Sequence, residues 1–316
     1  MLYVDNPVGA GFSFTEGGYC KNQTQIGEEV YEALRQFFII FPEIVSNDFF
    51  ISGESYGGKY SIAVAHTIHK KNPTAHSKIN LKGISCGNGV VDPEHEVYYA
   101  EYYYQLGLID FNTKKVIEKL EMRAAEKIHK HEYKLGLSYM TEAVLSRHSI
   151  FAAASGFEGN FYNLLSWNHT VNNTNIEKFL ARADIRVALH VGNRTFQDGG
   201  VVMEHLLDEM MVSLAPLMIE LLNHYRVLVY SGQLDLIVPY PITLNYLRHL
   251  NFSSVEEYKT AKRSVWRIEE DIAGYVKKAG NLTEVMVRNA GHMAIHDQPS
   301  WLYYLFRQFF RNKSIV

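Results

Sequence analysis

A serine lies between two glycines in the sequence Gly53-Glu54-Ser55-Tyr56-Gly57. The short apolar run Phe49–Ser52 precedes this motif, and a helical pattern from about Lys59 to Lys71 follows it. A G-x-S-x-G motif between a strand and a helix is typical of the nucleophile elbow, a strained turn that lifts the serine hydroxyl above the end of a sheet. The bare motif also occurs by chance, but this context favours Ser55 as a nucleophile.

A serine hydroxyl needs a base to take its proton, and the base needs an acid to orient it. In sheet hydrolases with this elbow, the acid and then the histidine follow the serine along the chain, each after a strand. Asp235 lies just past the strand-like run Val227–Tyr230, and His292 follows the run Val285–Val287. This order predicts Ser55 as the nucleophile, His292 as the base and Asp235 as the orienting acid.

The remaining histidines and cysteines do not indicate a metal site. The chain has 14 histidines, and each one other than His292 is better explained as a surface or core residue. His129 and His131 lie in a charged helical stretch with Glu132, which we interpret as a solvated helix face. No H-E-x-x-H motif occurs, and two cysteines are too few for a zinc knuckle. We therefore expect no metal and no other cofactor.

The composition excludes several classes of protein. The chain has 316 residues, of which 47% are hydrophobic, and a globular chain of this length buries roughly 75% of its unfolded surface. Its 31 basic and 34 acidic residues give a net charge of -3, so we expect no nucleic-acid partner. The most apolar run, Phe37–Phe41, is far shorter than the roughly 20 residues of a membrane helix, so we expect no membrane span.

Strands and helices alternate in the first part of the chain. Leu2–Asn88 reads as strand, helix, strand, helix and strand, which is typical of a parallel sheet with crossover helices. Thr24 is a candidate cap for the first helix, and Pro42 stops it. Later segments return to sheet or helix character, and the predicted ranges are Arg226–Tyr230 and Val285–Val287 for strands and Ser254–Ala279 and Ser300–Arg311 for helices.

The middle of the chain differs from both ends because its pattern is mainly helical from about residue 98 to 215. Asn112–Lys134, for example, reads as one charged amphipathic helix. We therefore predict an α/β fold in a single domain over residues 1–316. Its mostly parallel sheet is flanked by helices, and a helical insertion, or lid, is carried on it.

The chain contains seven N-x-S/T triplets, whereas one or two would be expected by accident. Seven indicate glycosylation in the secretory pathway, in a secreted or lysosomal protein. Met1–Asp5 has no signal-peptide character, so we expect the natural N-terminus to lie upstream. The glycosylation candidates are Asn22, Asn168, Asn172, Asn193, Asn251, Asn281 and Asn312.

The two cysteines leave their redox state open. Cys86 lies in an apolar run that ends in Gly87-Asn88-Gly89, so we favour a buried small hydrophobic residue. Cys20 lies in a polar turn region, where a partner outside this chain is conceivable. A disulfide between Cys20 and Cys86 does not follow from the sequence.

Six motifs in the same order resemble one family. Each is a moderate signal by itself, but together they are very specific. Over nearly its whole length the chain resembles the serine carboxypeptidases of the α/β-hydrolase superfamily, most closely the vitellogenic-carboxypeptidase-like branch. The motifs are Tyr3-Val4-Asp5-Asn6-Pro7-Val8-Gly9 with Gly11-Phe12-Ser13-Phe14, Gly53-Glu54-Ser55-Tyr56-Gly57-Gly58-Lys59-Tyr60, Gly87-Asn88-Gly89 with Asp92-Pro93, Val187-Ala188-Leu189-His190-Val191-Gly192, Ser231-Gly232-Gln233-Leu234-Asp235, and Ala290-Gly291-His292 with Asp297-Gln298-Pro299.

The resemblance implies a role for each matching position. Ser55, His292 and Asp235 would form the catalytic triad, and the backbone N–H of Tyr56 would bind the oxyanion. Glu54, as a protonated acid, would bind the C-terminal carboxylate of a peptide, and Met293 would line the pocket for the departing residue. The implied partners are peptides or proteins with a free C-terminus. Two carboxylates in contact retain a proton, so we expect an acid-leaning enzyme.

The chain departs from the family at its start. The family's Asn-Gly-Gly-Pro-Gly motif and the opening strands of its sheet would lie upstream of Met1. That motif supplies a second oxyanion donor, and the loss of one such donor costs roughly 10²–10³ in rate. We therefore expect this chain, expressed alone, to be inactive or poorly folded.

Two alternatives use the same residues. An acyltransferase would employ the same triad, with an alcohol or amine in place of water on the acyl-enzyme. A non-catalytic relative would keep the fold for binding. The intact set Ser55, Asp235 and His292 argues against the second alternative, and the absent upstream motif argues for it.

Overall fold

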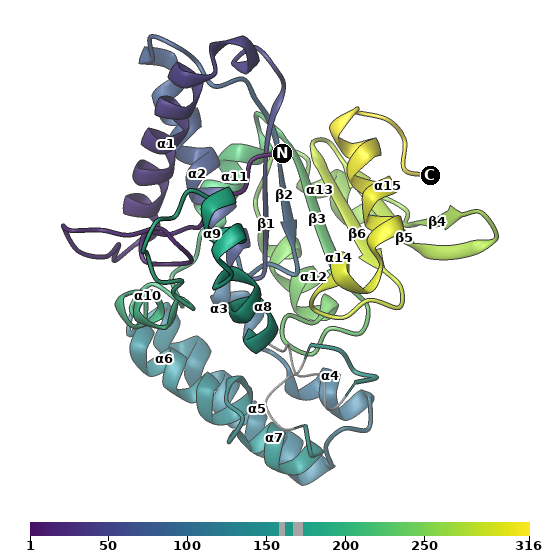
Figure 1. Ribbon diagram of the computed structural model, residues 1–316. Helices are drawn as coiled ribbons and strands as arrows, with labels where there is room; N and C mark the ends of the chain where they lie inside the picture. Colours follow the sequence, from purple (N-terminus) through teal and green to yellow (C-terminus); the bar gives the residue numbers. More distant parts are fainter. Residues whose placement is uncertain (158–161, 167–172) are drawn as a thin grey trace.

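A central sheet forms the frame of the molecule. The computed structural model describes residues 1–157, 162–166 and 173–316. These residues form one six-stranded sheet in the order β1-β2-β3-β6-β5-β4 (Figure 1). The first four strands in this order are parallel to one another, and each of the last two strands is antiparallel to the strand before it. The bounds are β1 (Phe49–Glu54), β2 (Leu81–Gly87), β3 (Arg226–Gly232), β6 (Leu282–Val287), β5 (Asp271–Ala279) and β4 (Ser264–Ile268).

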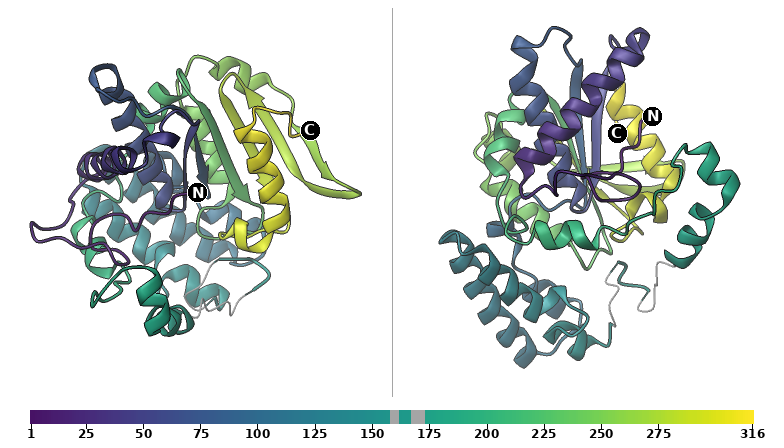
Figure 2. Two further views of the ribbon diagram at one scale, coloured as in Figure 1. Left: turned by 45° about the horizontal axis from the view of Figure 1, so that its top comes forward. Right: turned by 60° about the vertical axis from the view of Figure 1, so that its left-hand side comes forward.

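Side chains alternate along β3 between two hydrophobic cores, as the period of two in a strand requires. Val227 and Val229 pack in a core with α1 (Gln23–Ile40), α2 (Gly57–Lys71) and α11 (Ala215–Leu222). Leu228 and Tyr230 pack in a second core with α15 (Pro299–Phe310). Helices therefore cover both faces of the sheet (Figure 2). Full burial of each such Val or Leu contributes roughly 1.5–3 kcal/mol.

The prediction of Thr24 as the cap of α1 is wrong by two residues, since the helix begins at Gln23. The side chain of Asn22 accepts a hydrogen bond from the backbone N–H of Gln25 at 2.9 Å, so Asn22 is the cap. Asparagine is among the preferred residues at this position because its oxygen satisfies an N–H that the helix leaves free. Pro42 follows the helix and opens the short 3₁₀ turn Pro42–Ile44.

The middle of the chain is helical and has a hydrophobic core of its own. Tyr103, Ile117 and Phe151 are buried there, together with Leu236 and Ile242 from the chain that follows β3. This packing supports the proposed organisation, a single domain with a helical insertion at about 98–215. The helices of this part are α3 (Pro93–Glu96), α4 (Ala100–Gln105), α5 (Phe111–His129), α6 (Tyr133–Met140), α7 (Ile150–Ser155), α8 (Asn173–Leu180), α9 (Ala183–Ala188) and α10 (Gly200–His205). In Figure 1, α5, α6 and α7 lie below the sheet, and α9 lies at the level of the sheet.

The prediction of one helix over Ser254–Ala279 is wrong. Only α13 (Val255–Thr260) is helical, and the rest forms the hairpin of β4 and β5. Glu269, in the tight turn between these strands, has a φ of 54°, which does not fit a continuing helix. The edge of β6 selects the strand because Gly274–Ala279 pair with Val287–Leu282 along it.

Leu2–Val4 was also predicted as a strand, and the structure shows none there. All three residues are exposed, and they pair with none of the described strands. A strand needs a neighbour for its N–H and C=O groups, so an apolar run alone does not make one. The segment is instead tied locally, because the Asp5 carboxylate accepts the N–H of Phe12 at 2.8 Å.

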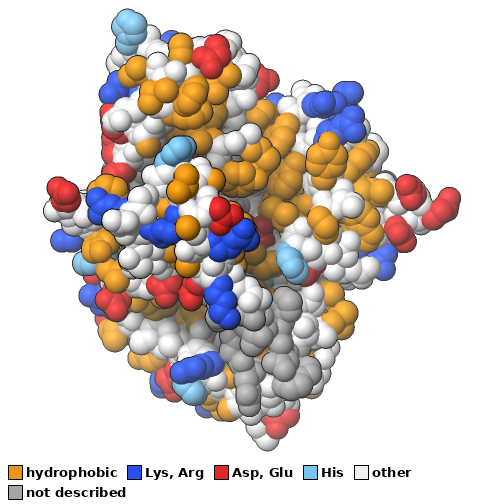
Figure 3. Space-filling view, in the orientation of Figure 1, with side chains coloured by type: hydrophobic (Ala, Val, Ile, Leu, Met, Phe, Trp, Pro, Cys, Tyr) orange, Lys and Arg blue, Asp and Glu red, His pale blue; other side chains and the backbone are white. Residues whose placement is uncertain are grey.

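The strand β1 forms one edge of the sheet of described residues. Five of its six residues are half-buried and one is exposed, whereas all six residues of β6 are buried. In the view of Figure 3, hydrophobic side chains gather over this edge, between α1 and α15. Among the described residues, no helix combines the length and the apolar character needed to cross a membrane.

Candidate active site

Ser55 lies on a strained turn between β1 and α2, as the motif predicts. Its φ is 57°, in the left-handed region that a residue with a side chain rarely adopts. A Cβ atom on Gly53 would lie only 1.9 Å from the carbonyl oxygen of Gly57, so glycine is required before the turn. The backbone N–H of Ser55 donates to the carbonyl of Gly87 at 2.8 Å, which joins the turn to the end of β2.

His292 follows β6 and reaches back to the serine. Its Nε2 lies 2.8 Å from Ser55 Oγ, and only 2% of its surface is exposed. The turn before it, Asn289–Gly291, contains Asn289 with a φ of 54°, which redirects the chain at the end of the strand.

Asp235 follows β3 and is fully buried. Its Oδ2 lies 2.8 Å from Nδ1 of His292, and its Oδ1 accepts the backbone N–H groups of Ile237 at 2.7 Å and Val238 at 3.1 Å. The structure thus brings the three predicted residues together, because the carboxyl ends of parallel strands meet at one edge of the sheet.

Electrostatics at His292 favour its positive form. Burial by itself would lower the pKa of the imidazole, but the Asp235 carboxylate and Glu54 outweigh burial and raise the pKa above the ordinary histidine value. An imidazolium that forms when His292 takes a proton is therefore stabilised by the residue that orients the ring.

Glu54 ends β1, immediately before the serine. Its burial raises the pKa of the carboxyl above the ordinary value, against the opposing effects of His292 and of Tyr230. The Tyr230 hydroxyl donates to Glu54 Oε2 at 3.2 Å. The other oxygen, Oε1, is buried without a hydrogen-bond partner among the described residues. A buried polar atom without a partner is costly, which disfavours the ionised form of this carboxyl.

The two other predicted site residues lie next to this cluster in the chain. Tyr56 directly precedes α2, and the first N–H groups of a helix have no acceptor within it. Met293 follows the histidine, precedes α14 (Ala294–Asp297) and is 41% exposed. Its side chain is therefore accessible to a bound molecule.

Asn88 contacts the cluster, although no role was predicted for it. It is buried, has a φ of 41°, and donates through Nδ2 to Asp235 Oδ2 at 2.5 Å. Its position directly after β2, at the same sheet edge as Ser55 and Asp235, was the signal that would have pointed to it. We call residues 289–292, which lead from β6 to His292, the base loop. Tyr162 and Asp297 also contact this loop, and no local sequence pattern indicated Tyr162.

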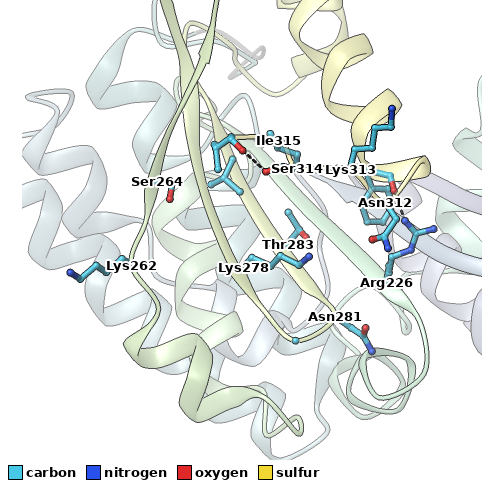
Figure 4. Close-up of a pocket in the computed structure, with 14 residues that line it drawn as sticks. Arg226, Lys262, Ser264, Lys278, Asn281, Thr283, Asn312, Lys313, Ser314 and Ile315 are labelled. Carbon is cyan, nitrogen blue, oxygen red and sulfur yellow. Dashed lines mark hydrogen bonds between the residues drawn. The ribbon is translucent and has the colours of Figure 1, made fainter.

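A charged cavity lies away from this cluster. A cavity of about 580 Å³ opens at the amino ends of β3 and β6, where Arg226 and Asn281 stand (Figure 4). Ser55 and His292 lie at the opposite, carboxyl ends of the strands, so this cavity is separate from the candidate site. Within the described parts of the chain, no cluster of His, Cys, Asp and Glu has the geometry of a metal site.

The modification candidates are distributed over the surface. Asn193, Asn251, Asn281 and Asn312 are exposed, and Asn22 is the half-buried cap of α1. Asn168 and Asn172 lie outside the described residues. Cys20 and Cys86 are both buried and free, and burial raises the pKa of each thiol to about 12.

The sequence of the chain is similar to those of known proteins. The family model described as serine carboxypeptidase matches residues 1–312. The venom serine carboxypeptidase of Apis mellifera is 45% identical over 99% of this chain and 69% of that protein. The vitellogenic carboxypeptidase of Aedes aegypti is 38% identical over 98% of this chain and 67% of that protein. Both agree with the predicted branch.

The fold is also that of a solved carboxypeptidase. The structure of Kex1(delta)p, a prohormone-processing carboxypeptidase from Saccharomyces cerevisiae, superimposes with a TM-score of 0.75 at 22% identity. The match covers 98% of this chain and 73% of that one. The predicted fold class, a mostly parallel sheet flanked by helices, is confirmed.

Proposed function

The chain belongs to the serine carboxypeptidase family, and we propose that Ser55, His292 and Asp235 remove C-terminal residues from peptides. One observation carries the proposal. The hydroxyl, the imidazole and the carboxylate form a chain of two hydrogen bonds. Ser55 Oγ lies 2.8 Å from Nε2 of His292, and Nδ1 of His292 lies 2.8 Å from Asp235 Oδ2. Nucleophile and base are thus within the reach that proton transfer needs.

Acylation begins when Ser55 Oγ attacks the carbonyl carbon of the last peptide bond. Nε2 of His292 takes the hydroxyl proton, and Asp235 stabilises the imidazolium through Nδ1–H. The carbonyl oxygen becomes an oxyanion, which the backbone N–H of Tyr56 binds at the positive end of α2. When the tetrahedral intermediate collapses, the C–N bond breaks. His292 then gives its proton to the nitrogen of the departing amino acid.

Deacylation repeats these proton transfers with water as the nucleophile. His292 takes a proton from the water as its oxygen attacks the acyl carbon. The ester bond to Ser55 then breaks, and the proton returns to Oγ. This step releases the shortened peptide and regenerates the Ser55 hydroxyl. Water and the three side chains supply every proton and bond, so the cycle needs no cofactor.

Glu54 explains why the enzyme acts at a C-terminus. Its carboxyl faces the same edge as Ser55, and burial raises its pKa, so it retains a proton at a pH where an exposed glutamate has lost it. A protonated Glu54 donates a hydrogen bond to the terminal carboxylate of the peptide. The exposed Met293, beside His292, then lines the space for the side chain of the departing residue.

Glycosylation and a secretory location are part of the same proposal. Four sequons have exposed asparagines, at Asn193, Asn251, Asn281 and Asn312, as transfer of a glycan requires. One relative is described as a venom protein. Protein expressed in insect cells should lose mass on treatment with an N-glycosidase, and an unchanged mass would contradict this part.

The triad is tested with the purified full-length enzyme and its Ser55→Ala variant. A fluorophosphonate probe should label the enzyme at Ser55, and blocked dipeptides should lose their C-terminal residue. The Ser55→Ala variant should lose the label and at least about 10⁴ of the hydrolysis rate. Labelling or hydrolysis that survives in the variant would disprove the assignment.

A further inference from the structure

A short segment of the helical part of the chain lies between the loops that carry the acid and the base. We call Tyr162–Leu164 the bridge segment. The backbone N–H of His292 donates to the carbonyl of Tyr162 at 2.5 Å. The backbone N–H of Leu164 donates to the carbonyl of Leu234, the residue before Asp235, at 2.8 Å. The bridge segment therefore binds both loops through its own backbone.

We call residues 233–235, which lead from β3 to Asp235, the acid loop. This loop and the base loop are also joined directly. The backbone N–H of Leu234 donates to the carbonyl of Ala290 at 2.8 Å. Leu234 thus uses its N–H toward the base loop and its C=O toward the bridge segment. This closed ring of hydrogen bonds fixes the spacing of three segments that are remote in sequence.

A side-chain pair completes the connection. Asp297 Oδ2 accepts the backbone N–H of Gly291 at 2.7 Å and the side-chain Nδ2 of Asn163 at 3.0 Å. Asn163 Oδ1 accepts the N–H of Leu165 at 3.0 Å, which sets the orientation of the amide. The other oxygen of Asp297 lies 3.4 Å from Nδ1 of the exposed His296.

The packing at this point leaves no room for a side chain. A Cβ atom on Gly291 would lie 2.1 Å from the Tyr162 carbonyl oxygen and 2.8 Å from Asn163 Cβ. The base loop and the bridge segment are therefore in direct backbone contact. Any shift of the bridge segment is transmitted to the residue next to His292, because closely packed backbones have no slack to absorb it.

We propose that Asn163 and Asp297 are positioning residues that hold His292 at hydrogen-bond distance from Ser55. The inference rests on the proposed function, since it takes His292 as the base. Both residues act through the backbone of Gly291 and His292, and neither contacts Ser55. Displacement of a reacting group by about 1 Å costs on the order of 10²-fold in rate, so the pair has a large effect on turnover.

The test replaces the amide of Asn163 by a carboxylate in the full-length enzyme. Asn163→Asp places a second carboxylate against Asp297, and two carboxylates in contact cannot both be ionised. Relative to the parent at each pH, the rate of Ser55 labelling by a neutral fluorophosphonate should be nearly unchanged at about pH 5. It should be more than about tenfold lower at about pH 7.5, with the thermal midpoint measured alongside.

The double variant Asn163→Asp with Asp297→Asn leaves one carboxylate in the pair, so the repulsion that depends on pH is removed. In the parent one oxygen, Asp297 Oδ2, accepts both bonds, and an amide cannot reproduce both with one atom, so the rate itself need not return to that of the parent. The ratio of its labelling rate to that of the parent should instead agree within about threefold between the two pH values, which a loss of stability in the single variant would not explain. Asn112→Asp adds the same charge at an exposed position and serves as the matched control.

Two outcomes would overturn the inference. One is a labelling ratio for Asn163→Asp that stays constant with pH, and the other is a double variant whose labelling ratio still falls with pH as that of the single variant does. If Asn163→Asp does not fold, Asn163→Ala decides the question, with kcat expected to fall and KM to stay constant. An increase in KM at constant kcat would reject positioning. Failure of the proposed function shows separately, as labelling or hydrolysis that does not require Ser55.

Discussion

The two sides of the proposed triad are built differently. Asp235 and His292 follow β3 and β6 in the interior of the sheet, and their exposed fractions are 0% and 2%. Ser55 follows β1, the edge strand of the described sheet, whose residues are half-buried or exposed. The acid and base are thus held by buried loops on covered strands, and the nucleophile is held at a boundary of the sheet.

The forces that fix each side differ accordingly. Asp235 accepts hydrogen bonds from Ile237, Val238 and Asn88 besides the one from His292, so its orientation is fixed by many donors. Ser55 is fixed by its backbone, with a φ of 57° and a bond from its N–H to Gly87. The comparison indicates that the acid side is sensitive to changes in hydrogen bonding. The nucleophile side is sensitive to any atom that crowds the backbone of the turn around Ser55.

The largest effect is expected for Asp235→Asn. An amide at this position lacks the negative charge and favours the wrong tautomer of His292, so kcat should fall on the order of 10⁴-fold. The backbone N–H groups of Ile237 and Val238 still find an oxygen, but the new amide NH2 faces the buried Nδ2 of Asn88, so the thermal midpoint should fall as well. Steady-state kinetics and a melting curve measure both. A kcat within tenfold of the parent would show that the acid side does not act as described.

A single methyl group at Gly53 should disrupt the turn that holds Ser55. In Gly53→Ala, the new Cβ meets the Gly57 carbonyl at 1.9 Å, so the turn must open. We expect a loss of about 1–3 kcal/mol in the free energy of unfolding and a fall in kcat of roughly 10²-fold. Denaturant unfolding and active-site labelling measure these.

Gly57→Ala is the matched control for this prediction. A Cβ atom at Gly57 has no heavy atom within 4 Å among the described residues. The free energy of unfolding should therefore stay within about 0.5 kcal/mol of the parent. Equal destabilisation by the two variants would mean that the close approach at Gly53 does not fix the elbow.

The same contrast explains what the sequence could reveal. Ser55, Asp235 and His292 were predicted because each stands in a short motif after an apolar run, and the order along the chain is informative. The hairpin of β4 and β5 was missed because pairing with β6 selects it, and periodicity within 254–279 does not show that partner. The contact of Tyr162 with His292 is a hydrogen bond between backbone groups 130 positions apart in the chain. The side chains take no part in it, so residue types could not predict it.

A smaller effect is expected for Glu54, which stands on the nucleophile side and is coupled to the acid–base side. The raised pKa of Glu54 means that its protonated, peptide-binding form persists at low pH and is lost as the pH rises through that pKa. KM for a peptide should therefore rise with pH in the parent. Glu54→Gln keeps a donor at every pH, so its KM should vary less than about threefold between pH 4 and 8.

The same substitution should also move the acid limb of kcat/KM, which reports the free enzyme. In the free enzyme the Glu54 carboxylate helps to raise the pKa of His292, so its removal lowers that pKa, and the neutral base persists to a lower pH. The acid limb of kcat/KM should then shift toward lower pH. The acid limb of kcat should stay in place, because Glu54 is protonated and uncharged in the complex. Initial rates from pH 4 to 8 separate these effects. A KM slope that survives in Glu54→Gln would remove Glu54 from carboxylate binding, whereas an unshifted kcat/KM limb would show that the two sides of the triad are not electrostatically coupled through this residue.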